Sequence, residues 1–264
     1  MSHAISSWGP VRVYSRDWTY FRLVWRTALF GSVAQPLMYL LGVGLGIGQL
    51  VDSGPGGADA LGGVSYFAFY ATALLATTPM FVLGQEALWP TMDGFTWSQA
   101  HQAMIAAPLN SRDVVLGKGL YYSLRGVFTC GGVALVLACF DDTRSWGLVV
   151  AVPVGVLTGL AFAMPIAAWI ATRQSDNSFS AILRFGIIPM FLFGGAFYPI
   201  DQLPSALAVV ARLTPIWHGI ELCRGLVLGG LDVATGFVHL FVLLGFVVAG
   251  SVVATITFDR RLRP

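Results

Sequence analysis

Residues 147–170 read GLVVAVPVGVLTGLAFAMPIAAWI, a run without a single charged side chain. A helix needs about 20 mainly apolar residues to cross a lipid bilayer, so this run is long enough to span one. The whole chain shares this character, since 56% of its 264 residues are apolar and 11% are charged. Soluble domains carry roughly 25% charged residues. The composition therefore predicts a lipid-facing surface and excludes a soluble enzyme, a nucleic-acid-binding domain, a disordered protein and a secreted disulfide scaffold.

Five further stretches have a similar length and apolar character, which makes six predicted membrane spans. The six windows are Ala28–Val51, Val64–Gly84, Gly119–Phe140, Gly147–Ile170, Ala181–Tyr198 and Gly236–Phe258. No stretch between them is long or polar enough to fold as a separate soluble domain. We therefore predict an all-α integral membrane protein with six transmembrane helices, in which residues 1–264 form a single transmembrane domain.

The positions of lysine and arginine beside these spans predict the orientation of the chain, because cytoplasmic segments carry an excess of both. With the N-terminus in the cytoplasm, twelve of the 15 basic residues lie on the inner side or just within the spans next to it. These twelve are Arg12, Arg16, Arg22, Arg26, Arg112, Lys118, Arg125, Arg173, Arg184, Arg260, Arg261 and Arg263. The outer side has only Arg144, Arg212 and Arg224. Both termini are therefore predicted to be cytoplasmic.

Three connections between spans are more than simple turns. Residues 1–27 mix aromatic residues with four arginines, which is typical of a helix in the membrane interface; an anchor for the first span is the alternative. Residues 85–113 form the longest cytoplasmic loop. Residues 199–235 are too apolar for a free outer loop, and Pro204 and Pro215 each suit a helix start. We predict a re-entrant hairpin of two short helices there, which dips into the outer leaflet and packs against the spans.

No motif in the chain carries catalytic chemistry. The sequence lacks GxSxG, HExxH and Walker-type GxxxxGK[ST] patterns. The four histidines lie in different segments, and the three cysteines lack metal-ligand spacing. We predict no catalytic residue, no metal and no cofactor on this chain. Uphill transport would then draw its energy from a partner or from an ion gradient.

The acidic residues bear on the ion-gradient alternative. Ion-driven carriers usually place carboxylates or broken helices near the membrane midplane. Here the carboxylates fall outside the span centres, and Glu86, Asp93 and Asp113 lie on the inner side. The six spans also give no obvious pair of matching repeats. These observations weaken a secondary transporter but leave it as the alternative.

One basic residue lies deeper in its span than its neighbours. Arg125 is seven residues beyond Lys118, about 10 Å farther along a helix with a rise of 1.5 Å per residue. A guanidinium at that depth either snorkels back to the headgroups or contacts a polar or anionic substrate in an inner vestibule.

Glycines in the first span favour close helix packing. Gly42, Gly44, Gly46 and Gly48 form two overlapping GxxxG faces. Such faces let helix backbones approach each other within a subunit or across a dimer interface, and the sequence leaves both possibilities open.

Three segments together carry a family resemblance. The inner loop has Thr96 and Trp97, then AMIAAPL at 103–109 and RDVVLGK at 112–118. The outer segment reads PMFLFGGAFYPIDQLP at 189–204 and LTPIWHGIELCRG at 213–225, and the chain closes on RRLR at 260–263. Over nearly the whole chain this pattern resembles the permease subunit of type-2 ABC exporters. The branch it most resembles is the lipo-oligosaccharide (nodulation-factor) exporters, with antibiotic-efflux permeases as cousins.

The resemblance implies a half-transporter in the bacterial cytoplasmic membrane. Two copies pair among membrane lipids, and each docks on a separate cytoplasmic ATP-binding subunit that holds ATP and magnesium. The cargo that it implies is amphipathic: a lipid-linked saccharide, a lipid or a drug. No nucleic acid is expected as a partner.

The resemblance also implies that the inner loop is the ATPase-coupling element. A short helix over about Thr96–Ala107 is expected to present Trp97 and Met104 on one face as a knob for a groove on the ATPase. Pro108 would end that helix. Glu86 either bridges to basic groups at this joint or is a solvated carboxylate at a helix end.

On the outer side, the predicted hairpin carries three polar residues at helical spacing. His218, Glu221 and Arg224 follow each other at steps of three residues, which predicts one shared helical face. They form either a buried local ion pair or an outer gate that keeps the exit closed until the ATPases dimerise.

Overall fold

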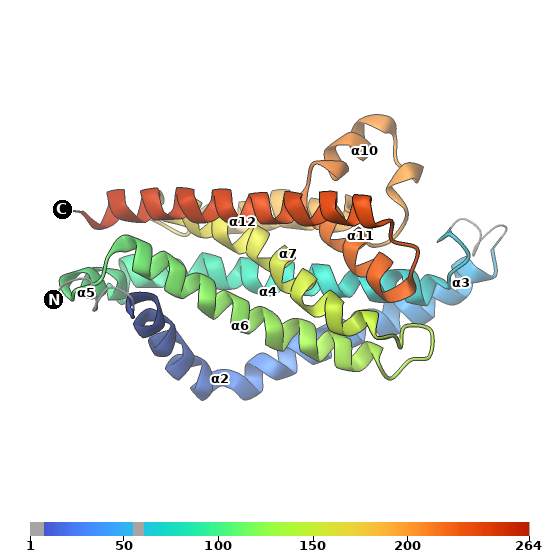
Figure 1. The fold of residues 1–264 in the computed structure, drawn as a ribbon, viewed down its shortest axis with the longest axis horizontal. Coiled ribbons are helices and arrows are strands. Elements are labelled where there is room, and N and C mark those ends of the chain that lie inside the picture. Colours follow the sequence, from blue (N-terminus) through green and yellow to red (C-terminus); the bar gives the residue numbers. More distant parts are fainter. Residues whose placement is uncertain (1–7, 55–60, 264) are drawn as a thin grey trace.

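The computed structural model describes residues 8–54 and 61–263, and these residues form helices without a strand (Figure 1). The α-helices are α2 (Gly9–Tyr39), α3 (Gly48–Asp52), α4 (Tyr66–Thr96), α5 (Ala100–Ala106), α6 (Ser111–Leu137), α7 (Gly147–Ile170), α8 (Phe179–Ile182), α9 (Ile188–Phe193), α10 (Ser205–Arg212), α11 (Pro215–Leu228) and α12 (Val233–Leu262). Two π-helical segments, η1 (Leu40–Ile47) and η3 (Leu183–Ile187), and a 3-10 turn, η4 (Ile200–Gln202), lie between them. The predicted all-α fold is confirmed.

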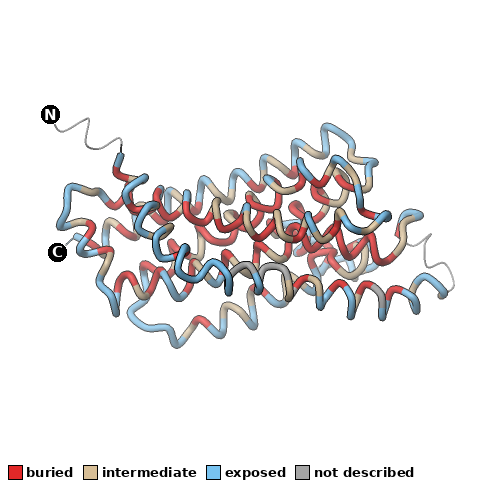
Figure 2. The backbone as a smooth tube through the Cα atoms, turned by 90° about the horizontal axis from the view of Figure 1, so that it is seen from below, coloured by how far each residue is buried: buried red, intermediate tan, exposed pale blue. Residues whose placement is uncertain are grey.

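The long helices run side by side in one elongated bundle (Figure 1). The start of α2, helix α5 and the end of α12 lie at one end, which we call the α5 end. Helix α3 and the start of α4 lie at the other, the α3 end. Figure 2 shows buried residues concentrated along the middle of the bundle. Helix α4 is the most enclosed of the long apolar helices, with 83% of its apolar window buried, and it packs against α7, α6 and α11.

Four helices in the described part of the chain are long and apolar enough to cross a membrane: α4, α6, α7 and α12. They coincide with the second, third, fourth and sixth predicted windows. The first window falls on a shorter apolar stretch, Pro36–Asp52, and the fifth on another, Phe179–Phe193. Helices α10 and α11 together also reach the length of a span but are bent by 81°. The number of six crossings and the re-entrant hairpin therefore stay predictions.

No helix boundary separates the predicted interfacial segment at 1–27 from the predicted first span, and the interfacial position of that segment stays a prediction. A single helix, α2, runs from Gly9 to Tyr39 and continues through η1 into α3. Residues 1–7 lie outside the described part of the chain. The helix continues because no glycine or proline stands between Val11 and Phe30 to stop it. Figure 1 shows the run changing direction along α2, whose main neighbour is α6.

The glycines of the first window divide between two faces. A Cβ added at Gly44 would lie 3.1 Å from the Phe67 ring, and one at Gly48 would lie 3.6 Å from Tyr66. That face packs on α4 within the chain. At Gly42 and Gly46, no described atom lies within 4 Å of the same position. This second face is open to lipid or to another chain.

A close backbone approach joins α4 to α7 in the middle of the bundle. A Cβ added at Gly155 of α7 would lie 2.2 Å from the carbonyl oxygen of Leu75 on α4. On its other side α7 meets α12, where a Cβ at Gly250 would lie 2.6 Å from Pro165. Helices in lipid associate largely through van der Waals packing, so small residues at a crossing let the backbones come close. Glycines therefore set the position of α7 between α4 and α12.

Gly155→Ala tests this contact, and Gly131→Ala on α6 is the matched control. Alanine stabilises a helix interior by about 1 kcal/mol relative to glycine, and at Gly131 no described atom lies within 4 Å of the new methyl group. At Gly155 the methyl group would overpack against Leu75, at a cost of about 1–3 kcal/mol. Thermal unfolding in detergent should give a lower Tm for Gly155→Ala and an unchanged or higher Tm for Gly131→Ala. Equal shifts would show that the α4–α7 contact has room for a side chain.

Candidate functional site

Helix α5 and the turn before it form one end of the bundle. The predicted helix over Thr96–Ala107 is wrong at its start, because α4 continues to Thr96 and the chain then turns at Gln99, whose φ is 49°. A left-handed residue does not continue a right-handed helix, so the turn separates α4 from α5. Trp97 consequently caps the end of α4 and is 57% exposed. The helix α5 ends at Ala106, and Pro108 follows soon after, as predicted.

Two side chains of α5 fasten it to the bundle. Met104 is 8% exposed and packs into a cluster formed by α2, α4, α6, α7 and α12, so it points into this chain and not outward. His101 is fully buried against the rings of Phe95 and Phe258, with centroids 4.5 and 5.5 Å away. Burial, assisted by nearby cations, holds the pKa of His101 well below its ordinary value, so the ring is neutral. Of the residues predicted to couple to the ATPase, Trp97 and Pro108 are exposed.

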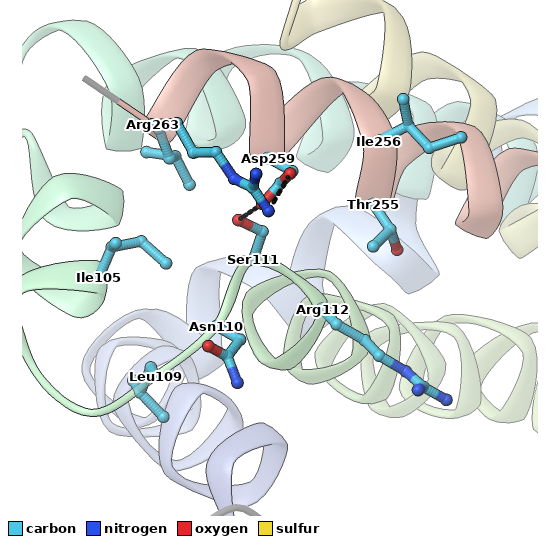
Figure 3. A pocket seen from close by; sticks show the side chains of 10 residues that line it. Ile105, Leu109, Asn110, Ser111, Arg112, Thr255, Ile256, Asp259 and Arg263 are labelled. Atoms are coloured by element: carbon cyan, nitrogen blue, oxygen red, sulfur yellow. Dashed lines mark hydrogen bonds and ion pairs between the residues drawn. The ribbon is translucent and has the colours of Figure 1, made fainter.

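A pocket of about 470 Å³ opens beside α5, between the start of α6 and the end of α12 (Figure 3). Ser111 Oγ donates a hydrogen bond to Asp259 at 3.2 Å, and Arg263 pairs with the same carboxylate at 2.9 Å. Figure 3 shows these three side chains converging while Arg112 extends away from them. Ile105 of α5 also lines the pocket, so a molecule bound there would touch α5, α6 and α12 together.

Arg125, the basic residue predicted to lie deeper in its span than its neighbours, forms an ion pair with Glu86 of α4. Arg125 Nε donates to Glu86 Oε1 at 3.0 Å, and the two side chains are 8% and 20% exposed. The guanidinium also lies over the Phe21 ring of α2, 5.1 Å from its centroid. Its Nη1 has no hydrogen-bond partner among the described residues. Arg125 therefore turns inward, toward α4 and α2.

A second ion pair lies nearer the α5 end. Lys118 Nζ is 3.9 Å from Asp17 Oδ2, and the lysine side chain is 5% exposed. Both pairs join α6 to another helix, and we call their four residues (Asp17, Glu86, Lys118 and Arg125) the inner charged cluster. Asp17 is a member of this cluster that was not predicted from the sequence. The spacing of four residues between Asp17 and Phe21 could have indicated it, because that spacing puts both residues on one face of α2.

At the α3 end, Arg224 of α11 joins three segments. It pairs with Glu221 at 2.7 Å and donates to the Gly195 carbonyl at 2.8 Å. It also donates to the Phe69 carbonyl at 3.4 Å, and its guanidinium lies 3.6 Å from the centroid of the Phe69 ring. The ion pair predicted within α11 is present, and the same arginine ties α11 to α4 and to the turn after α9.

His218 does not join that pair. Its Nδ1 lies 2.7 Å from Nδ1 of His239 on α12, and its Nε2 lies 2.9 Å from the carbonyl oxygen of Arg212. Both rings are buried, and Trp217 packs edge-on against each of them. The prediction that three polar residues of α11 share one face is wrong. Each step of three residues turns a helix position by about 60°, so the first and last of them face different neighbours.

The described residues contain no group of three or more His, Cys, Asp or Glu side chains placed to hold a metal ion. The cysteines are free: Cys130 and Cys223 are buried, and Cys139 is exposed.

The class of this protein follows from residues 13–228, which match the family described as ABC-2 type transporter. The match covers most of the chain, and the chain belongs to this family. It is therefore a membrane-embedded transport component, and membership implies association with ATP-binding subunits. The resemblance inferred from the sequence is confirmed.

Three proteins similar to this chain are each named Nodulation protein J. The protein of Rhizobium meliloti (strain 1021) is 30% identical over 259 residues, which cover 98% of this chain and 96% of the relative. The protein of Rhizobium leguminosarum bv. trifolii is 31% identical over 254 residues, covering 96% and 93%. That of Rhizobium leguminosarum bv. viciae is 32% identical over 249 residues, covering 93% of each chain.

The Arg125–Glu86 ion pair is expected to stabilise the folded protein, and substitutions at the two residues test this. Arg125→Leu removes one partner and leaves a mostly buried carboxylate unpaired, which should destabilise the protein by roughly 3 kcal/mol. Adding Glu86→Gln removes that carboxylate charge, so the double variant should recover most of the loss. Tm values in detergent for both single variants and the double variant measure this coupling. Arg144→Leu, at an exposed arginine near the α3 end, is the control. Losses that simply add would show that the two side chains do not depend on each other.

Proposed function

We propose that this chain is the permease half of an ATP-driven exporter that moves an amphipathic molecule out across the bacterial cytoplasmic membrane. The observation that carries the proposal is the family membership over residues 13–228, supported by the relatives named Nodulation protein J. ATP and magnesium would be held by a separate ATPase chain, and no cofactor by this one. The alternative is an ion-gradient-driven secondary transporter, which the lack of carboxylates at the predicted span centres disfavours.

In the proposed topology, the α5 end faces the cytoplasm and the α3 end faces outward. The support is the set of arginines at or near the helix ends there: Arg12, Arg112, Arg173 and Arg260. The α2–α3 run and the α8–α9 run would supply two further crossings, which makes six with both termini inside. The 81° bend between α10 and α11 suits a re-entrant hairpin that returns to the outer side.

Helix α5 is the proposed coupling element, and the bundle would take up its motion. Trp97 and Pro108 are exposed at this end, where an ATPase would dock. His101 and Met104 hold α5 against the long helices, so a push on its exposed side would reach them directly. Packed interiors shift as units and do not deform continuously. Glu86, on the same helix as the Trp97 cap, would pass this motion to α6 through Arg125.

Arg125 is the proposed contact for a polar or anionic part of the cargo in an inner vestibule. The support is its burial together with the Nη1 that has no partner among the described residues. The proposed cargo is a lipid-linked saccharide, a lipid or a drug, as the family resemblance implies. At the other end, the α10–α11 hairpin with His218, Glu221 and Arg224 is the proposed outer gate.

A second copy of the chain and membrane lipids would cover the apolar faces that the bundle leaves open. Only 22% of the apolar window of α12 is buried. Helix α2 exposes large apolar side chains such as Leu23 and Phe30, at 81% and 74%. The open face of Gly42 and Gly46 suits the close contact of a helix from a paired subunit.

Trp97→Ala should weaken docking, measured as recovery of the ATPase subunit with the tagged permease. Exposed aromatic anchors carry much of the energy of an interface, so a loss of several-fold is expected. Trp146→Ala is the matched control, because Trp146 is 89% exposed near the opposite end. Met104→Ala should instead lower Tm with or without the ATPase, since a cavity at a buried methionine costs about 2–5 kcal/mol. Equal ATPase recovery for the two tryptophan variants would place docking elsewhere.

A transport assay distinguishes an ATP-driven exporter from an ion-gradient-driven secondary transporter. In vesicles that contain the permease and its ATPase, export should require ATP and persist with a protonophore. ATPase stimulation across a panel of glycolipids, phospholipids and drugs would identify the cargo class. Arg125→Lys keeps the charge but loses the planar fork, so it should retain part of that stimulation, with basal hydrolysis unchanged. Export without ATP that a protonophore abolishes would favour the secondary transporter.

A further inference from the structure

Two buried histidines connect three helices at the α3 end. His218 lies on α11 and His239 on α12, and they are 6% and 4% exposed. Their Nδ1 atoms are 2.7 Å apart. Nε2 of His218 is 2.9 Å from the carbonyl oxygen of Arg212, the last residue of α10. The contacts therefore run from α12 through α11 to the end of α10, and we call them the histidine relay.

The donor and acceptor capacity of each group determines which ring nitrogens of the relay carry a hydrogen. A backbone carbonyl oxygen only accepts, so His218 carries its hydrogen on Nε2. A neutral imidazole has a single N–H, so Nδ1 of His218 accepts and Nδ1 of His239 donates. Nε2 of His239 is then the ring nitrogen of the relay whose lone pair is not used within it.

The histidine relay contacts the corner of the outer hairpin, which is the bend between α10 and α11. Most of α11 is buried, whereas only Ala208 and Ala211 are buried on α10, which projects from the bundle in Figure 1. The side chain of Arg212 pairs with Asp201 at 2.6 Å, which is a bond within the hairpin and not to the bundle. The relay instead connects the 81° corner between α10 and α11 to a long helix.

We propose that His218 and His239 are positioning residues of the outer gate, whose hydrogen bond holds the α10 corner against α12 until the gate opens. The gating role rests on the proposed function, but the fastening does not. A neutral hydrogen bond suits a fastening of this kind, since it orders two groups at a small net free energy and is readily broken. His239 had no predicted role in the gate, because its partner lies on another helix.

The geometry also sets the pH dependence of the relay. A proton added to Nε2 of His239 leaves the Nδ1 donor in place, so the relay persists. A second proton, on Nδ1 of His218, puts hydrogens on both facing nitrogens and breaks it. The corner should therefore open only at a pH well below the ordinary imidazole value of about 6.5, because the second proton enters a ring that already faces a cation.

The charged groups on the neighbouring elements are engaged with other partners. Glu221 and Arg224 of α11 pair with each other, and Arg212 of α10 pairs with Asp201. At the start of α12, Asp232 accepts hydrogen bonds from Thr235. Helix α7, which packs against both α11 and α12, has no charged residue. The proton balance of the relay is therefore set by the two imidazoles.

A single cysteine on α10 can report the opening of the corner. Ala211 is 4% exposed, so Ala211→Cys should react slowly with a membrane-impermeant maleimide while the corner is closed. The full chain carries Cys139→Ser as well, because Cys139 is the exposed one of the three free cysteines. At neutral pH, His239→Leu should raise the labelling rate roughly three- to tenfold, the change expected from the loss of one neutral hydrogen bond. His239→Asn should label at the parent rate, since its amide nitrogen can replace the Nδ1 donor.

Matched variants keep the test informative if one protein fails to fold. Val238→Leu, at an exposed neighbour on α12, controls for the substitution itself. On the other ring, His218→Asn retains an acceptor for His239 and should label more slowly than His218→Leu. Acidification well below the ordinary imidazole value of about 6.5 should accelerate labelling of the parent and leave His239→Asn unchanged, because an amide can turn its oxygen toward a protonated His218.

Two results would overturn the proposal: leucine variants that label as slowly as the parent, or a parent rate that is the same at neutral and acidic pH. Labelling is read without transport, so these results leave the exporter function untouched. A parent that labels as expected but exports without ATP would refute the proposed function alone. Faster labelling when ATP is added to the parent in complex with its ATPase would support the gating role.

Discussion

The close approach of α4 and α7 at Gly155 is the contact on which the rest of the bundle depends. Helices in lipid gain little from apolar burial against each other, so they associate where their backbones can come within van der Waals contact. With α7 held between α4 and α12, α4 becomes the enclosed helix of the bundle. It then receives the two buried arginines, Arg224 at Phe69 near its start and Arg125 at Glu86 about two thirds of the way along it. A side chain at Gly155 would disturb both contacts at once.

Both arginines hold a neighbouring helix to α4 and leave one nitrogen, Arg125 Nη1 and Arg224 Nε, without a partner among the described residues. A buried donor without an acceptor costs free energy, so its surroundings must keep it in place. In a protein that changes shape, such a donor can take a new acceptor without first breaking a bond. These two contacts on α4 are therefore the places where a small helix shift would change the partners of a charged group.

The two ends of the bundle are fastened by different interactions. At the α5 end, His101 and Met104 fix α5 by packing, which suits an element that must move together with the long helices. At the α3 end, the histidine relay fixes the α10 corner by hydrogen bonds, which suits an element that must separate from its neighbour. Packed side chains shift together as a unit, whereas a neutral hydrogen bond has a small net free energy and is readily exchanged for other partners.

The sequence by itself determined the helical fold, the windows occupied by α4, α6, α7 and α12, the two short helices begun near Pro204 and Pro215, and the family. These features depend on local composition, length and helix-start chemistry. Only the tertiary structure decided which side chains meet. Glu86 and Arg125 are 39 residues apart, and His218 and His239 are 21 apart, each pair on different helices. Spacing along the chain gives the face of a residue on its own helix, but its partner depends on how the helices are rotated and packed together.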